Sequence, residues 1–164
     1  MTLQGPSGPT FSAVADSGST GAAAPPSQSG WIWLFLAWLV ALVATLGALF
    51  IGEVLGQAPC LLCWYQRIAM FPLVLILGIA CLRDDLGVIP YAAMLTAVGG
   101  LVALWHTALY VGLIPQAIEP CGTGPSCTSG AMTIFGGLPI PALSVAGFAA
   151  IGTCLVLAKQ RSPG

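Results

Sequence analysis

The sequence predicts an all-α integral membrane protein, a four-helix bundle with both cysteine-containing loops on the extracytoplasmic side. Two observations support the membrane assignment. The chain is 57% hydrophobic and only 5% charged, whereas a soluble domain carries roughly a quarter charged residues. Its apolar residues also form four runs, each close to the roughly 20 residues that a helix needs to cross the hydrocarbon core of a bilayer. A chain of 164 residues is long enough for one such domain.

The chain divides into a membrane domain and two tails. Residues 1–30 are rich in Gly, Ala, Ser, Pro and Thr. Such a segment buries too little apolar surface to offset the conformational entropy lost on ordering, so we expect a disordered cytoplasmic tail. This tail has no Lys or Arg and so lacks the basic region of a cleavable signal peptide. The membrane domain is expected over 31–158 and a cytoplasmic C-terminal tail over 159–164. The expected spans are about 31–53, 62–82, 89–114 and 139–158.

The first span has no charged residue between Trp31 and Gly52. Trp31 and Trp33 suit a membrane–water interface, where aromatic residues are enriched. Glu53 closes the run, either as an acid at the interface or as part of a site near the cysteines that follow. Gly52 and Gly56 form a small-xxx-small pair, which permits close helix approach.

The later spans are separated by turns. Pro72 lies inside the second run, where a kink is expected rather than a break because neighbouring helices can satisfy the freed carbonyl. A charged turn at 83–85 follows, and Pro90 marks the start of the third run. The segment from 115 to about 138 has the length of a functional loop. Pro139 opens the fourth run, because proline is tolerated in the first turn of a helix.

Charge distribution predicts which side each loop occupies. Four spans place both termini on one side, together with Arg83, Lys159 and Arg161, against Arg67 alone on the other. Because cytoplasmic loops carry an excess of Lys and Arg, we expect both termini in the cytoplasm. Both cysteine pairs, Cys60–Cys63 and Cys121–Cys127, then face away from the cytoplasm, where disulfides persist.

Two function classes are excluded by composition and spacing. The net charge is −1 and the chain has no cluster of basic residues, so it lacks the positive surface that nucleic-acid binding requires. Zinc sites typically pair two close cysteine motifs. Here the second cysteine pair is too widely spaced, and no other cysteine or histidine is close in sequence. The sequence therefore predicts no metal site and no nucleic-acid partner. The lipid bilayer is the partner that the composition itself predicts.

Cys60 and Cys63 form a C-x-x-C pair at the expected start of the second helix. A helix N-terminus lowers the pKa of a thiol in this spacing, so the pair favours electron transfer over a structural role. Arg67 comes four residues after Cys63, on the same helical face. A charge at this depth is costly without a partner. That partner is either a thiolate or polar headgroup, or the interface itself reached by snorkelling.

The other cysteines differ in expected role. Cys121 and Cys127 are separated by five residues in the long loop, and they form either a static disulfide that staples the loop or a second redox pair. Cys81 and Cys154 lie near the cytoplasmic ends of their spans, where we interpret them as small packing residues.

His106 is the single histidine. If the third span ends near 114, His106 lies about 12 Å deep, and Arg67 about 6 Å below Cys63, at 1.5 Å per residue. His106 is therefore either a packing residue or a functional group in the outer leaflet. Trp64 and Tyr65 are expected in an interfacial aromatic belt.

The nine residues from Pro59 to Arg67, Pro-Cys-Leu-Leu-Cys-Trp-Tyr-Gln-Arg, resemble the signature of the disulfide-bond formation protein B family, which includes DsbB and BdbC-like quinone-linked thiol oxidoreductases. The resemblance covers about residues 31–158. Weaker matches are Phe71-Pro72-Leu73, Glu53, His106-Thr107 and Ile140-Pro141-Ala142-Leu143-Ser144.

The resemblance implies a four-helix enzyme of the bacterial inner membrane. It would reoxidise a DsbA-like thioredoxin-fold oxidase and pass the electrons to the membrane quinone pool, ubiquinone or menaquinone, thereby supporting disulfide bond formation. Cys60 and Cys63 would be the quinone-facing pair, with Cys63 engaging the quinone. Arg67 and His106 would contribute to the quinone site.

By the same resemblance, Cys121 and Cys127 would face the partner, whose thiolate attacks Cys121. A transient Cys60–Cys127 disulfide would relay the electrons. The chain departs from the long-loop members of the family, because its second pair is separated by only five residues. In that respect it is similar to the BdbC-like branch.

Two alternatives remain open at this point. A relative of vitamin K epoxide reductase would also combine a C-x-x-C pair with quinone, but late in the bundle rather than at the start of the second span. A non-catalytic membrane scaffold would hold both cysteine pairs as permanent disulfides.

Overall fold

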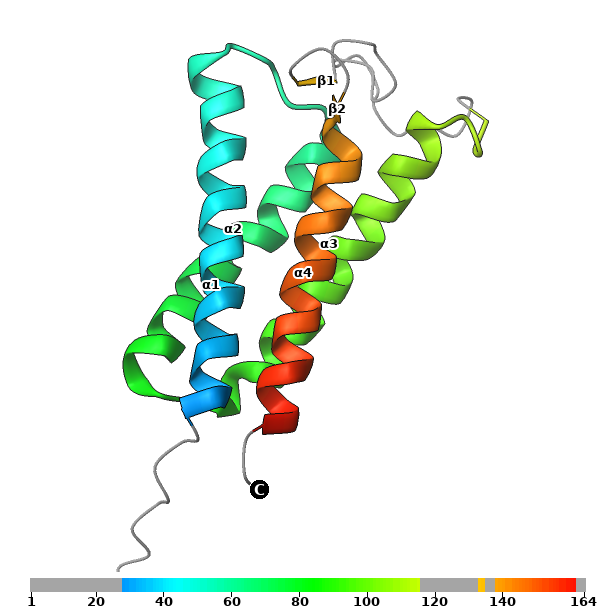
Figure 1. The fold of residues 1–164 in the computed structure, drawn as a ribbon. Coiled ribbons are helices and arrows are strands. Elements are labelled where there is room, and N and C mark those ends of the chain that lie inside the picture. Colours follow the sequence, from blue (N-terminus) through cyan, green and yellow to red (C-terminus); the bar gives the residue numbers. More distant parts are fainter. Residues whose placement is uncertain (1–27, 116–132, 135–137, 162–164) are drawn as a thin grey trace, which may run out of the picture.

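The computed structural model describes residues 28–115, 133–134 and 138–161. Four long helices dominate the described part of the chain (Figure 1): α1 (Gln28–Leu49), α2 (Leu61–Arg83), α3 (Ile89–Tyr110) and α4 (Ile140–Arg161). A five-residue π-helix, η1 (Phe50–Val54), continues α1, and a short 3₁₀ helix, η2 (Leu86–Val88), precedes α3. Each long helix is apolar and long enough to cross a membrane. The predicted helical membrane bundle is confirmed, and the protein is a multi-pass membrane protein.

The four helices form a ring in which α1 and α3 each pack against both α2 and α4. Their order is up-down-up-down, so the start of α1 and the end of α4 meet at one end of the bundle (Figure 1). Two contacts tie this end together. The Trp31 indole N–H donates to the Cys81 carbonyl at 3.1 Å, and the Arg161 guanidinium lies 5.7 Å from the centroid of the Trp33 ring.

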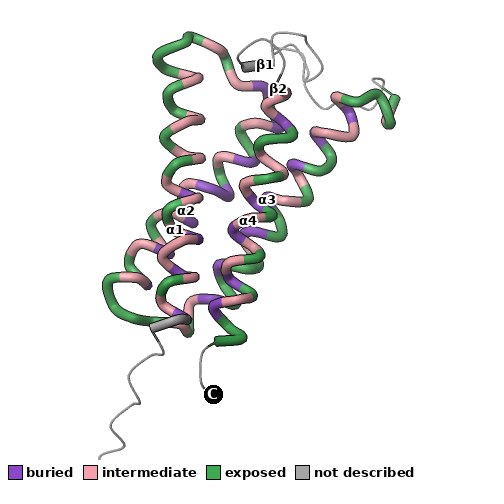
Figure 2. The backbone as a smooth tube through the Cα atoms, viewed as in Figure 1, coloured by how far each residue is buried: buried purple, intermediate pink, exposed green. Residues whose placement is uncertain are grey.

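The core of the bundle is narrow because each helix buries one stripe and turns the rest outward (Figure 2). Leu73, Leu77, Ile151 and Leu155 are fully buried, or nearly so, along the axis. Many large apolar side chains are exposed on the outside, where a lipid environment would cover them. At Gly99 a Cβ atom would overlap the Phe148 ring, so a glycine is needed where α3 crosses α4.

The helix ends differ in part from the expected spans. The third helix stops at Tyr110 rather than near 114, and Gly112 follows with φ +77° in a turn. The fourth helix continues to Arg161, which places Lys159 and Arg161 in its last turn. Basic residues there interact favourably with the negative end of the helix dipole. Pro72 lies inside α2 without ending it.

A two-residue antiparallel ladder is the one β feature of the described chain. The strands β1 (Thr133–Ile134) and β2 (Leu138–Pro139) pair Thr133 with Pro139 and Ile134 with Leu138. This ladder leads directly into α4 and was not predicted. The predicted tail as far as residue 27, together with Cys121 and Cys127, lies outside the described residues.

Candidate functional site

The Cys60–Cys63 pair forms the start of α2, as the spacing predicted. Cys60 is the N-cap residue, in an extended conformation with φ −69° and ψ 168°, and its Sγ accepts a hydrogen bond from the Cys63 backbone N–H at 3.4 Å. The first N–H groups of a helix have no partner within the helix, so an N-cap side chain that accepts one of them stabilises the end. The C-x-x-C spacing therefore places both sulfurs at the positive end of the helix dipole.

The two sulfurs lie close together in the reduced state. Both cysteines are free thiols, and their Sγ atoms are 3.0 Å apart, within hydrogen-bond distance. Cys60 is fully buried and Cys63 partly so. The hydrogen bond from the Cys63 thiol lowers the pKa of Cys60 to about 4, against the opposing effect of burial and with further help from His106. The reduced pair thus holds a thiolate on Cys60.

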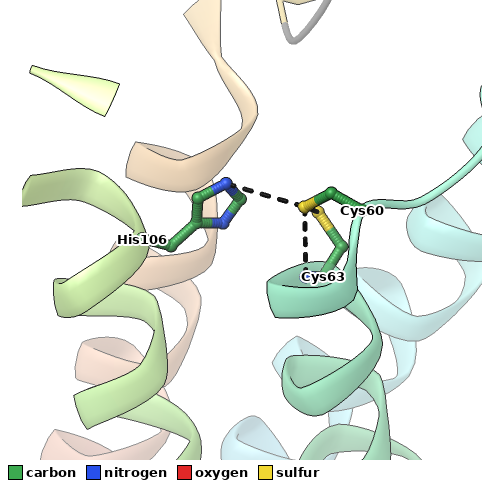
Figure 3. Close-up of side chains that lie close together, drawn as sticks. All are labelled: Cys60, Cys63 and His106. Carbon is green, nitrogen blue, oxygen red and sulfur yellow. Dashed lines mark hydrogen bonds between the residues drawn. The ribbon is translucent and has the colours of Figure 1, made fainter. Parts of the chain in front are cut away.

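His106 approaches Cys60 from α3 (Figure 3). The ring is fully buried, and its Nε2 lies 3.8 Å from Cys60 Sγ. On the other side of the ring, the Gln66 amide Nε2 lies 3.1 Å from His106 Nδ1. Because an amide nitrogen can only donate, Nδ1 accepts and the ring proton lies on Nε2, facing the sulfur. His106 is therefore held as a hydrogen-bond donor to the Cys60 thiolate.

The depth expected for His106 is corrected by the end of α3. His106 lies one turn before Tyr110, where the helix ends, so at 1.5 Å per residue it is about 6 Å from that end rather than about 12 Å. This shift brings it level with the start of α2. The sequence pattern also missed Gln66, which is buried on α2. Its signal was a polar side chain three residues after Cys63, and therefore on the same face of the helix.

A small apolar cluster encloses the dithiol. Cys60, Leu62 and Leu109 are its buried members, and Val102 and Tyr110 pack against them among the partly buried residues. Polar interactions are stronger in such a low-dielectric setting than in water. The hydrogen bonds of Cys60 to Cys63 and His106 therefore act with little screening.

Arg67 has a partner that neither sequence interpretation named. Its Nη2 donates to the Ala48 carbonyl on α1 at 2.7 Å, and its guanidinium lies 5.8 Å from the centroid of the Trp64 ring. A Cβ atom at Gly52 would lie 3.1 Å from Nη2, so glycine leaves room for this approach. The charge is thus held against α1, next to the π-helix η1, by a backbone carbonyl.

The remaining candidates lie nearby or elsewhere. Glu53 is exposed on η1. Trp64 and Tyr65 are about half exposed at the start of α2, as an interfacial belt requires. Cys81 and Cys154 are partly buried and pack against the main core cluster. The structure thus brings together Cys60, Cys63 and His106, and it places Arg67 one turn further along α2, facing α1.

A family model described as disulfide bond formation protein DsbB matches residues 29–158, which is most of the chain. The chain belongs to the DsbB family. The family name implies disulfide oxidoreductase activity and a role in disulfide formation.

Curated relatives agree with the DsbB assignment. A probable disulfide formation protein of Metapseudomonas resinovorans is 55% identical over 140 residues, which cover 84% of this chain and 97% of that protein. The disulfide bond formation protein C of Bacillus subtilis is 38% identical over 128 residues, 78% of this chain and 93% of its own. A probable disulfide formation protein of Chlamydia trachomatis is 40% identical over 77% of this chain and 92% of its own length. No solved structure matches the chain.

Proposed function

We propose that this DsbB-family protein is a thiol oxidase of the bacterial inner membrane. It reoxidises a DsbA-like thioredoxin-fold oxidase outside the cytoplasm and passes the electrons to a membrane quinone, ubiquinone or menaquinone. Both termini lie in the cytoplasm, and both cysteine pairs lie on the opposite side. The observation that carries this proposal is the reduced Cys60–Cys63 pair at the start of a membrane helix, with a buried histidine whose Nε2 lies 3.8 Å from the Cys60 sulfur.

Electrons enter through the second cysteine pair, Cys121–Cys127, which lies outside the described residues. A thiolate of the reduced partner attacks Cys121, and the Cys121–Cys127 bond breaks to release Cys127 as a thiolate. Cys127 then attacks Cys60, and the Cys60–Cys63 bond breaks to release Cys63. Each step exchanges one disulfide for another and consumes no oxidant, as thiol–disulfide exchange requires.

The relay is completed when the partner leaves. Its second thiolate attacks the mixed disulfide, so the partner departs oxidised and Cys121 is released. Cys121 attacks Cys127, which restores the Cys121–Cys127 disulfide and releases Cys60. A thiol with a low pKa leaves faster, and the pKa of Cys60 is lowered to about 4 by the Cys63 thiol and, beyond it, by His106. The structure around Cys60 therefore favours this last exchange.

Oxidation of the Cys60–Cys63 dithiol closes the cycle. A quinone supplies the chemistry of a two-electron, two-proton acceptor when bound. The residues present fit such a group. Arg67 lies one turn beyond Cys63 on α2, carries five N–H donors and is fixed by the Ala48 carbonyl, so it could hold a quinone oxygen one turn from the dithiol. Trp64 and Tyr65, half exposed beside it, offer flat apolar surface to a ring arriving from the lipid.

Reconstitution tests the proposal. The full-length protein in proteoliposomes is mixed with a reduced thioredoxin-fold oxidase and a short-chain quinone, and quinone reduction is followed. We expect Cys63→Ala to abolish turnover and Cys81→Ala to retain it, because Cys81 lies outside the site. Turnover of Cys63→Ala at the parental rate would show that the dithiol does not carry the electrons.

A further inference from the structure

Three metal-ligand atoms converge at the start of α2 (Figure 3). The Cys60 Sγ, the Cys63 Sγ and a ring nitrogen of His106 all lie within 4.8 Å of one another. The sequence did not predict this set, because His106 is 46 residues from Cys60 in the chain. Two thiolates and an imidazole are ligands that zinc prefers, in a tetrahedral arrangement.

We propose that the reduced Cys60–Cys63 dithiol and His106 form a binding site for a soft divalent ion of the Zn²⁺ class, and that the bound ion reversibly blocks oxidation of the dithiol. The blocking of turnover rests on the proposed thiol oxidase function, whereas the binding itself does not.

The distances are close to those of a tetrahedral site. With Zn–S near 2.3 Å and Zn–N near 2.0–2.1 Å, tetrahedral angles require about 3.8 Å between two sulfurs and about 3.6 Å between sulfur and nitrogen. Cys60 Sγ and His106 Nε2 are 3.8 Å apart. The two sulfurs, now 3.0 Å apart, need to separate by roughly 0.8 Å, which a small change in χ1 of Cys63 supplies.

Charge and burial favour the bound ion. Binding releases the proton of the Cys63 thiol, because Cys60 is already a thiolate, and it transfers no electrons, since zinc remains divalent. Two thiolates neutralise the ion, so no net charge enters the apolar cluster that Cys60, Leu62 and Leu109 form. A buried charge without compensation would oppose binding, because its desolvation would not be repaid. Water takes the fourth position.

Gln66 completes the outer shell of the site. A histidine that binds metal through one ring nitrogen usually donates its other N–H to a fixed acceptor. Gln66 already contacts His106 Nδ1 at 3.1 Å. Rotation of its amide by about 180° presents the carbonyl oxygen in place of the nitrogen. Nδ1–H then donates to Gln66, and Nε2 carries its lone pair toward the ion.

The ion holds the dithiol in its reduced form. While both sulfurs are bound to it, neither can attack or form the Cys60–Cys63 disulfide, so the ion has to leave before oxidation. Cys81 and Cys154 lie in the core cluster on different helices and do not belong to the ligand set given by the described residues. They therefore serve as controls.

Binding is tested on the full-length protein in detergent, in a Cys121→Ser/Cys127→Ser background that removes the other thiol pair. Co²⁺ is the probe, because tetrahedral thiolate coordination gives it intense visible bands. We expect one Co²⁺ per reduced chain, displaced by Zn²⁺, with the same spectrum after Cys81→Ser/Cys154→Ser. His106→Ala should weaken binding at least tenfold, and Gln66→Ala by about 10–100-fold, the range for an outer-shell partner.

The oxidised protein provides a test that needs no substitution at the site. Its Cys60–Cys63 disulfide has no thiolates to offer, so it should give no tetrahedral cobalt spectrum. An equal spectrum from oxidised and reduced protein, or an unchanged affinity in His106→Ala, would overturn the site.

Regulation is tested separately on the protein with all its cysteines. Zn²⁺ should inhibit quinone reduction in proteoliposomes, and a chelator should restore it. Absence of metal binding would leave the thiol oxidase proposal intact, because the cobalt experiment contains neither partner nor quinone. Metal binding without inhibition of a working enzyme would overturn the block.

Discussion

His106 Nε2 lies 3.8 Å from Cys60 Sγ, although 46 residues separate the two in the chain. The contact joins α3 to the N-cap of α2, and Gln66 holds the opposite side of the ring. Hydrogen bonds to a charged group contribute about 1.5–3 kcal/mol, more than those between neutral groups. The contact therefore supports the proposal that the buried histidine has a chemical role as well as a packing role.

Replacing His106 should slow the release of Cys60 from its disulfides. Loss of a bond worth about 1.5–3 kcal/mol corresponds to a roughly 10–100-fold fall in kcat, at about 1.4 kcal/mol per tenfold change. We expect this fall for His106→Ala in the reconstituted assay, with a smaller fall for His106→Asn, whose amide can still donate. Equal activity of His106→Ala and the parent would reduce His106 to a packing residue.

The ionisation of Cys60 should show a low midpoint. The Cys63 thiol, and in second place the His106 hydrogen bond, lower the pKa of Cys60 to about 4 against burial, so the thiolate is present above that pH and is lost as the pH falls through it. Ultraviolet thiolate absorbance of the reduced Cys121→Ser/Cys127→Ser protein should therefore fall between pH 5 and 3, within roughly one unit of the pKa. His106→Ala should move this fall to higher pH. A thiolate signal that appears only above pH 8 would contradict a low pKa of Cys60.

Gly52 should control the position of Arg67. A Cβ atom at residue 52 would lie 3.1 Å from Arg67 Nη2, so Gly52→Ala should displace the guanidinium from the Ala48 carbonyl. Since Arg67 is proposed to hold the quinone, Gly52→Ala and Arg67→Ala should both raise the KM for quinone, the former a few-fold. Gly47→Ala on α1 is the matched control, because nothing lies within 4 Å of its added Cβ. If Arg67→Ala had the same KM for quinone and the same kcat as the parent, Arg67 would not be part of the quinone site.

Gly99 should matter for stability rather than for chemistry. A Cβ there would overlap the Phe148 ring and would also lie 3.0 Å from the Ala69 Cβ. Overpacking of this kind typically costs about 1–3 kcal/mol, so Gly99→Ala should lower the midpoint of thermal unfolding in detergent. Gly147→Ala on α4, with nothing within 4 Å of its Cβ, should not. Equal unfolding midpoints for Gly99→Ala and Gly147→Ala would contradict this prediction, because they would show that α3 and α4 can move apart to accommodate the extra Cβ without loss of stability.

The four helices and the start of α2 could be predicted from sequence because hydropathy and N-cap chemistry are local. Hydropathy alone predicted a third span that is too long. Residues 111–114 are as apolar as the helix before them, but they form a turn in which Gly112 has a positive φ, so the helix ends at Tyr110. This error placed His106 too deep.

The contacts of the site depended on how the helices pack. Arg67 donates a hydrogen bond to the backbone carbonyl of Ala48. Every residue has a backbone carbonyl, so the sequence does not indicate which one a side chain will contact. The pairing of Gln66 with His106 depends on the register of α2 against α3, which no spacing along one helix encodes. The possible ligand set of Cys60, Cys63 and His106 was missed for the same reason.

The central claim is that Cys60 and Cys63 cycle between dithiol and disulfide under control of a quinone. Thiol trapping in membranes, followed by mass spectrometry of the peptide that contains both cysteines, tests it most directly. We expect a mixed population that becomes reduced when quinone is depleted in the presence of a reduced partner, and oxidised again when quinone is restored. A pair that stays fully oxidised throughout would contradict redox cycling of Cys60 and Cys63 and favour a static scaffold.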